Sequence, residues 1–115
     1  MRKLDELKEI ILKFRDDRNW QQFHDPKNLS EAISIESSEL LENFLWKTKY
    51  ESTNLEGSDK KKIEEEVADI FIYILILCNE LDIDLIQVVK EKVEINEKKY
   101  PVDKSKGKRI KYNNL

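Results

Sequence analysis

Two pairs of acidic residues interrupt the most apolar stretches of this sequence. Glu36 and Glu39 are three residues apart within SEAISIESSELLENFLWK. Glu66 and Asp69 have the same spacing within EEEVADIFIYILILC. Residues three apart lie on one face of an α-helix, and a carboxylate in an apolar stripe is costly to bury unless a positive group meets it. Both pairs are therefore candidates for chemistry.

The chemistry that such pairs favour is divalent metal binding. If the two helices pack face to face, four carboxylates converge in a semi-buried place, where repulsion and desolvation forbid four bare charges. Hard cations that prefer oxygen ligands resolve the conflict, so we expect Mg²⁺, with Mn²⁺ as an alternative. Glu42 is a candidate for an additional ligand or base. Glu64 and Glu65 fit the solvated face better, although Glu65 lies four residues from Asp69 and stays a candidate ligand. The other interpretation also stays open, because in a chain with 24 acidic residues such pairs commonly lie on solvated faces.

The sequence does not contain the residues that other common types of catalytic site require. His24 is the only histidine, which excludes a histidine-rich zinc site and a Glu-x-x-His di-iron site. Cys78 is the only cysteine and lies in an apolar run, where we expect a small buried hydrophobe. The two glycines, at 57 and 107, are too far apart to form a phosphate-binding loop. Any phosphate chemistry must therefore depend on a metal.

The composition predicts a single all-α domain. The 115 residues include 39% charged and 39% hydrophobic residues but only two Gly and two Pro, which leaves little turn chemistry for strands. A net charge of −3 gives no basic field for nucleic acid. The apolar run 70–78 is too short to span a bilayer, so we expect no membrane partner. One cysteine and no secretory segment near the N-terminus favour a cytoplasmic location.

Hydrophobic periodicity predicts four helices. The second is capped by Asn28 or Ser30, the third by Ser58 or Asp59 and the fourth by Asp82 or Asp84, and helicity ends before Pro101. Four short helices cannot cover the apolar run on every side, so we expect self-association. We expect one domain over 1–103 and a mobile, basic polar tail over 104–115. The expected helices cover 4–18, from 28–30 to about 49, from 58–59 to about 81 and from 82–84 to about 100.

A loop between the first two helices is unusually aromatic. The segment NWQQFHDPKN contains Trp20, Phe23 and His24. These side chains either plug the end of the bundle or form the wall of a ligand pocket, since aromatic residues offer rigid surface at low entropic cost.

The chain resembles the MazG-like all-α nucleotide pyrophosphohydrolases, and most closely their short dCTP pyrophosphatase branch. The two acidic pairs match the paired motif of the family. Ser37-Ser38 departs from the small residue and Gly that the family often has there, and one extra Asp lies between Arg15 and Trp20. Further matches, in order, are RDDRNWQQFHDPKN at 15–28 with R-x-W-x-x-F-H-x-P-x-N, 44–47 with F-x-W-K, 69–73 with D-[VI]-x-x-Y, and KVEINEKKYP at 92–101 with K-x-x-x-N-x-x-[KR]-Y-P.

The resemblance implies hydrolysis of nucleoside triphosphates to the monophosphate and pyrophosphate, with dCTP or non-canonical nucleotides as candidate substrates. Glu36, Glu39, Glu66 and Asp69 would hold Mg²⁺, and Glu36 or Glu39 would position or deprotonate the attacking water. The resemblance also implies a four-helix bundle assembled as a dimer or a dimer of dimers, with sites at subunit boundaries. The implied substrate contacts are Trp20, His24, Trp46 and Tyr73 around the base, Lys92 and Asn96 near phosphate or sugar, and Asn28 and Lys47 within the matched motifs.

Two alternatives remain beside this assignment. Trp46 also fits the role of an ordinary core residue. The whole chain also fits a non-catalytic helical-bundle interaction module, in which the acidic pairs lie on the surface. A pyrophosphate assay with a panel of nucleoside triphosphates and Mg²⁺ separates the enzyme from the module.

Overall fold

The computed structural model describes residues 2–115, and every regular element in this range is a helix, as the composition predicted. None of the helices described in that range is long and apolar enough to cross a lipid bilayer. The chain divides into two compact units, one ending at Asp82 and the other covering Ile83–Leu115. The α-helices are α1 Arg2–Asp17, α2 Pro26–Glu42, α3 Lys49–Thr53, α4 Gly57–Glu80, α5 Leu85–Lys99 and α6 Val102–Ser105, and the 3-10 helices are η1 Gln21–Phe23 and η2 Tyr112–Asn114.

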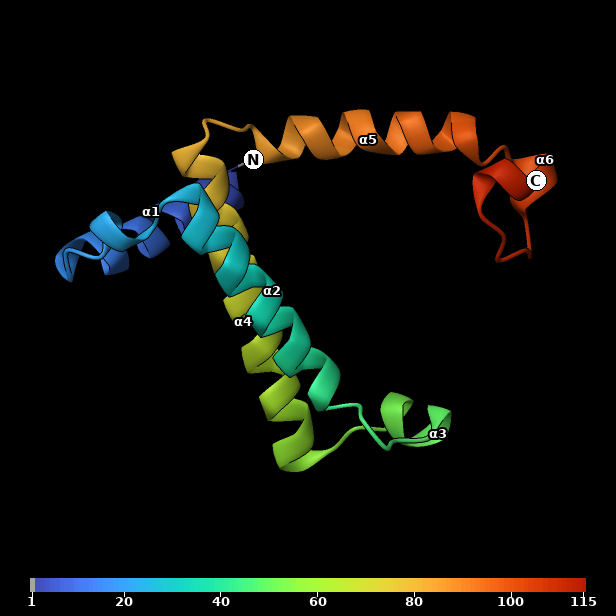
Figure 1. The fold of residues 1–115 in the computed structure, drawn as a ribbon, viewed down its shortest axis with the longest axis horizontal. Helices are drawn as coiled ribbons and strands as arrows, with labels where there is room; N and C mark the ends of the chain where they lie inside the picture. Colours follow the sequence, from blue (N-terminus) through green and yellow to red (C-terminus); the bar gives the residue numbers. More distant parts are fainter. Residues whose placement is uncertain (1) are drawn as a thin grey trace. The chain divides into compact units, whose positions relative to one another are not determined.

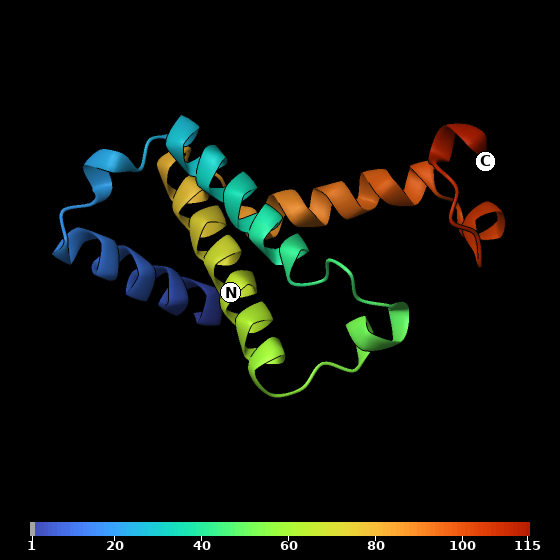
Figure 2. The same cartoon turned by 60° about the horizontal axis from the view of Figure 1, so that its bottom comes forward.

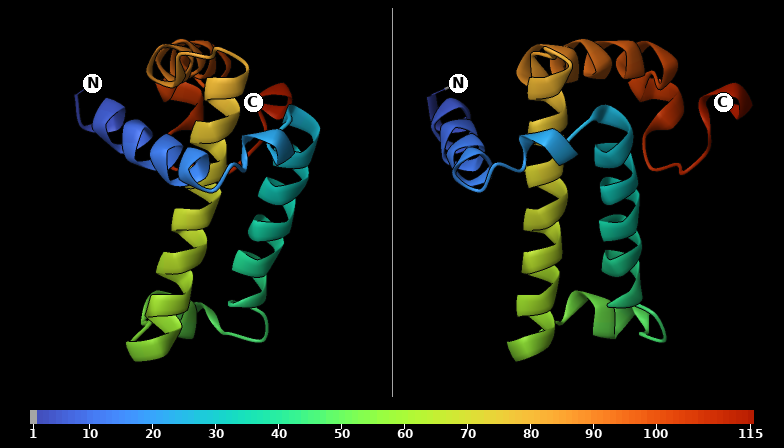
Figure 3. Two further views of the ribbon diagram at one scale, coloured as in Figure 1. Left: turned by 90° about the vertical axis from the view of Figure 1, so that its left-hand side faces the viewer. Right: turned by 60° about the vertical axis from the view of Figure 1, so that its left-hand side comes forward.

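In the first unit, α2 and α4 lie side by side and run in opposite directions (Figures 1 and 2). α1 packs across the C-terminal half of α4 (Figure 3). Amphipathic helices associate by burying their apolar stripes against each other. Accordingly, the buried apolar side chains come from all three helices: Ile11 from α1, Leu29 from α2, and Leu75, Ile76 and Cys78 from α4. The expectation that Cys78 is a small buried hydrophobe is confirmed.

The second helix differs from its prediction at both ends. α2 begins at Pro26, and its N-cap is Asp25, whose carboxylate accepts a 2.9 Å hydrogen bond from the backbone N–H of Asn28. The predicted caps, Asn28 and Ser30, were wrong because Pro is well suited to the first helical position and Asp to the cap before it. α2 ends at Glu42 rather than near residue 49.

The segment that follows α2 turns sharply before the chain becomes helical again. Trp46 has φ of 68°, a left-handed conformation that bulky residues rarely adopt and that an α-helix cannot contain. Thr48 then caps α3 through a capping box with Glu51, so the predicted polar connection holds a short helix.

The central helix α4 keeps part of its apolar surface exposed in a single chain. It begins at Gly57, with Glu56 as the N-cap and no side-chain cap, so Ser58 and Asp59 do not cap it. Within its apolar run, Phe71 stays 38% exposed, as expected of a run that the helices of one chain cannot cover on every side. Among the described residues, α2 and α1 make the main contacts along α4, and Val67 of α4 stays exposed.

The second unit contains α5, α6 and η2. Asp84 caps α5 by accepting a 3.2 Å hydrogen bond from the Gln87 backbone N–H, which confirms one of the two predicted caps. α5 ends before Pro101 as predicted, but helicity resumes in α6, and the Tyr100 and Tyr112 rings meet edge to face at 6.0 Å. The prediction of four helices is therefore corrected to four longer helices and two short ones. The domain boundary at residue 103 stays a prediction.

Candidate functional site

Three of the predicted metal ligands come together between α2 and α4. Glu36 and Glu39 from α2 and Glu66 from α4 each offer a carboxylate oxygen, and these oxygens lie within 4.8 Å of one another. All three side chains are half-buried. Antiparallel packing along the apolar stripes explains the convergence, because each glutamate occupies a position on or beside the stripe that faces the other helix. We call these three residues the carboxylate cluster.

Asp69 lies almost one helical turn beyond Glu66 on α4 and is not part of the carboxylate cluster. Its side chain is exposed and lines a separate cavity on the α1 side of α4. The structure thus places three of the four predicted ligands together, and the assignment of Asp69 to a metal stays a prediction.

The side chains of the carboxylate cluster crowd one another, and two of their oxygen atoms lack a hydrogen-bond donor among the described residues. A hydrogen bond shared with Glu66, then burial, then the neighbouring Glu39, raises the pKa of Glu36 to about 8. The Oε2 atoms of Glu36 and of Glu66 are buried without a hydrogen-bond partner among the described residues. At neutral pH this arrangement holds a proton between two carboxylates, because two adjacent charges cannot both ionise without a counter-ion.

The donor set fits a hard divalent cation. It consists only of carboxylate oxygens, two of which have unmet hydrogen-bonding capacity, and Mg²⁺ is bound in proteins through such oxygens. A cavity of about 320 Å³ opens directly beside the carboxylate cluster, and its lining is polar. Lys62 supplies the one cation among its lining residues, which are Glu39, Glu42, Asn43, Lys62, Glu65 and Glu66.

A larger, apolar cavity of about 560 Å³ lies between α1 and α4. It brings Trp20, His24 and Tyr73 together, as predicted for a pocket wall, and the His24 and Tyr73 rings meet edge to face at 6.3 Å. Trp20 stays 43% exposed, so the loop aromatics are not a sealed plug. The lining is Leu7, Ile10, Ile11, Phe14, Arg15, Trp20, His24, Ala68, Asp69, Phe71, Ile72, Tyr73 and Ile76.

Two titratable groups in this apolar cavity are held in their neutral forms. Burial, reinforced by the charge of Arg15 and opposed by Glu80, lowers the pKa of His24. The Nδ1 atom of His24 is buried and has no hydrogen-bond partner among the described residues. Burial, with the charges of Glu36 and Asp69, raises the pKa of Tyr73. Apart from Arg15 and Asp69, the cavity therefore presents neutral polar atoms within an apolar wall, which suits a flat, uncharged heterocycle.

The remaining predicted substrate contacts lie elsewhere. Trp46 is 94% exposed, so the alternative that it is an ordinary core residue is wrong. The Lys47 Nζ atom pairs with the Asp59 carboxylate at 3.4 Å, and the Asn28 side-chain amide donates a 3.1 Å hydrogen bond to the Phe23 carbonyl. The other two predicted substrate contacts, Lys92 and Asn96, are exposed and lie on α5 in the second unit.

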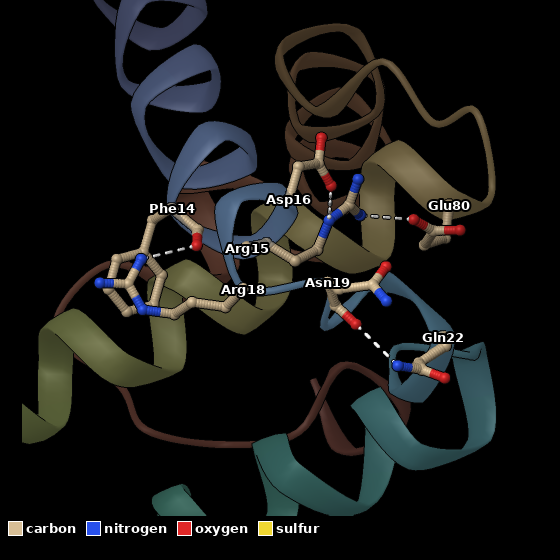
Figure 4. Close-up of polar contacts among 7 residues, drawn as sticks. All are labelled: Phe14, Arg15, Asp16, Arg18, Asn19, Gln22 and Glu80. Carbon is tan, nitrogen blue, oxygen red and sulfur yellow. Dashed lines mark hydrogen bonds and ion pairs between the residues drawn. The ribbon is translucent and has the colours of Figure 1, made fainter.

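Sequence reasoning missed one buried charged pair. Arg15 is only 3% exposed, and its Nη1 atom lies 2.6 Å from a carboxylate oxygen of Glu80 (Figure 4). Arg15 is four residues after the buried Ile11 and so continues an apolar stripe of α1, which is the one local indication that the sequence contains. Its partner lies 65 residues away, and no local pattern predicts that pairing.

Comparisons with known proteins find a matching family, related sequences and a related structure. The MazG-like family model matches residues 32–115. Over 114 residues, the chain is 35% identical to dCTP pyrophosphatase 1 of Mus musculus and 33% identical to that of Homo sapiens, covering 97% of this chain and 67% of each relative. A crystal structure of a pyrophosphatase from Archaeoglobus fulgidus superimposes with a TM-score of 0.80 at 46% identity, covering 85% of this chain and 92% of that one.

Proposed function

This chain belongs to the MazG-like family, and from that membership we propose that it hydrolyses nucleoside triphosphates to the monophosphate and pyrophosphate with Mg²⁺ as its cofactor. Curated relatives named dCTP pyrophosphatase and the archaeal pyrophosphatase structure support the assignment to the diphosphatases, which are hydrolases. Because these relatives carry dCTP in their names, dCTP is the first substrate to test. Non-canonical nucleotides are the second group.

The observation that carries the metal proposal is the carboxylate cluster with its two unpartnered oxygens. When bound, a divalent cation neutralises triphosphate charge and polarises the phosphoryl group under attack. Glu36, Glu39 and Glu66 would hold the cation, and Asp69 would join them when substrate is present. Whichever of Glu36 and Glu39 keeps a free oxygen would accept the proton of the attacking water.

The two cavities suggest where the ends of the nucleotide bind. The triphosphate would occupy the polar cavity, where Lys62 offers a positive charge beside the carboxylate cluster. The base would occupy the apolar cavity, against Trp20, His24 and Tyr73. Base–aromatic stacking contributes on the order of 1–3 kcal/mol per base. The remaining proposed substrate contacts are Asn28, Lys47, Lys92 and Asn96.

Self-association is part of the proposal. The side of α4 that carries Val67 and Phe71 is exposed in a single chain, and contiguous apolar surface of this kind favours a second protein surface. Trp46, which is almost fully exposed, would then contact the base bound by a second copy. We propose a dimer or a dimer of dimers in the cytoplasm, with no nucleic-acid or membrane partner. Light scattering coupled to gel filtration measures the assembly.

The reaction is tested by incubating the protein with a panel of canonical and modified nucleoside triphosphates, with Mg²⁺ and with EDTA. The proposal predicts pyrophosphate and the monophosphate in equal amounts, and only with Mg²⁺. Release of orthophosphate would reject the reaction class. Turnover in EDTA would reject the metal.

A further inference from the structure

Arg15 connects the end of α1 to the end of α4. Its guanidinium pairs with Glu80 at 2.6 Å and with Asp16 at 2.9 Å, and its side chain is almost completely buried (Figure 4). A buried charged pair contributes little net stability compared with apolar packing, but removing one partner leaves an uncompensated buried charge. Arg15 is buried and Glu80 half-buried, so their pair fixes the position of the Arg15 side chain more than it adds net stability.

The same residue also closes the turn that leads to the apolar cavity. The Arg15 carbonyl accepts a 3.1 Å hydrogen bond from the Trp20 backbone N–H, and the Asp16 carbonyl accepts one of 3.0 Å from the Asn19 N–H. With Asn19 at φ of 55°, this is a Schellman motif, which fixes the direction of the chain after a helix. The Gln22 side chain braces it by donating a 2.9 Å hydrogen bond to the Asn19 carbonyl.

This Schellman motif fixes the positions of the aromatic residues that line the apolar cavity. Trp20 follows the motif directly and packs edge to face on Phe14 at 5.7 Å, and His24 follows after the single turn of η1. Tyr73 lies on the opposite side of the cavity and belongs to α4. Glu80 is on the same helix and pairs with Arg15 of α1. The Arg15–Glu80 pair thus joins the two walls of the cavity at their common end.

We propose that Arg15 is a positioning residue for the nucleobase: its pair with Glu80 holds Trp20 and His24 against Tyr73, so that the cavity is preformed for an uncharged base. This inference rests on the proposed function. It assigns to Arg15 and Glu80 an effect on base binding, exerted through the aromatic residues, with no contact to the phosphates or the cation.

Electrostatics around His24 support the proposal and supply a distinctive readout. The charged or titratable groups that face His24 are Arg15 on α1 and Tyr73, Asp69 and Glu80 on α4. Arg15 lowers the pKa of His24 and Glu80 raises it. Burial is the larger cause of the lowered pKa of His24, and removing the Arg15 charge leaves burial in place but still moves the imidazole toward protonation at mildly acidic pH. A charged imidazole would no longer suit a neutral base in an apolar wall.

The test compares kcat and KM for dCTP between pH 6 and pH 8 in wild type, Arg15→Gln, Glu80→Gln and the control Lys13→Gln. Lys13 also lies on α1, but its 2.7 Å pair with Asp17 is exposed. We expect Arg15→Gln to raise KM about tenfold, the size of a lost base–aromatic stack, with kcat nearly unchanged. Its KM should rise further as the pH falls, and the control should match wild type.

The outcomes separate this inference from the proposed function. A wild-type protein that cleaves no nucleoside triphosphate would remove the proposed function itself. An active wild type with an unchanged KM in Arg15→Gln, or with a raised KM that is independent of pH, would overturn the positioning role alone. Glu80→Gln conserves side-chain volume, so a folded Glu80→Gln protein with wild-type KM overturns the inference even where Arg15→Gln does not fold.

Discussion

The carboxylate cluster predicts an unusual pH dependence of stability in the metal-free protein. The pKa of Glu36 is raised to about 8 in the folded chain, mainly by its contact with Glu66, from an ordinary value of 4.5. Between these two values the folded state binds more protons than the unfolded state. The free energy of unfolding must therefore fall as the pH rises through this window, and the stabilisation is lost above about pH 8.

The size of the effect follows from the shift. A full shift of this kind corresponds to several kcal/mol, but the carboxylate cluster is partly open to water, so screening reduces it to on the order of 1–2 kcal/mol. For a domain of this size that is a change in Tm of roughly 5 °C. His24 acts in the opposite direction, because its lowered pKa makes stability rise with pH below the ordinary histidine pKa of 6.5. The informative interval is therefore pH 6.5–8.

Thermal melts in EDTA, at one protein concentration and ionic strength, measure this dependence. Wild type should lose stability from pH 6.5 to pH 8, whereas Glu36→Gln, which removes the titrating group, should be nearly flat. Glu64→Gln alters an exposed residue two positions from the cluster member Glu66 and should follow wild type. A wild-type curve that is flat or rises over the interval would refute the proposed crowding of charge.

Three further predictions concern the metal and the base. Mg²⁺ at a hundredfold excess over its Kd should stabilise wild type by about 2.7 kcal/mol. Glu66→Gln, which removes one of the crowded carboxylates, should be at least as stable as wild type in EDTA but respond less to Mg²⁺. A large loss of stability in EDTA would show a structural role for Glu66 instead. Trp20→Ala should raise KM for the nucleotide by roughly tenfold while circular dichroism stays helical; unfolding would show that this tryptophan is part of the core. Trp46→Ala should weaken nucleotide binding only in the assembled protein, and an equal loss in a monomeric variant would contradict a contact across subunits.

Local periodicity was sufficient to predict the carboxylate cluster but not its full membership. Positions on an apolar stripe face the neighbouring helix, which is why Glu36 and Glu66 meet. An i,i+3 pair, however, is separated by about 60° around the helix axis, so both members need not face the same neighbour. On α2 this rotation leaves Glu39 facing α4. On α4 the same rotation places Asp69 at the cavity shared with α1.

Helix ends and long-range pairs were harder to predict. The end of α2 depends on the left-handed backbone at Trp46, which no propensity of tryptophan indicates. The Thr48–Glu51 capping box is a local pattern that does predict a helix start, so α3 was open to prediction and was overlooked. The Arg15–Glu80 pair depends on how α1 packs on α4, and that is a property of the tertiary structure.

The most direct test of the account is Mg²⁺-dependent pyrophosphate release by wild type, Glu66→Gln and Glu64→Gln, measured on dCTP over a Mg²⁺ titration. Glu66 belongs to the carboxylate cluster and Glu64 is exposed on the same helix, so the two substitutions remove equal charge at different places. The account predicts that Glu66→Gln loses most of its turnover at every Mg²⁺ concentration while Glu64→Gln retains that of wild type. Wild-type turnover in Glu66→Gln would contradict the assignment of the carboxylate cluster as the metal site.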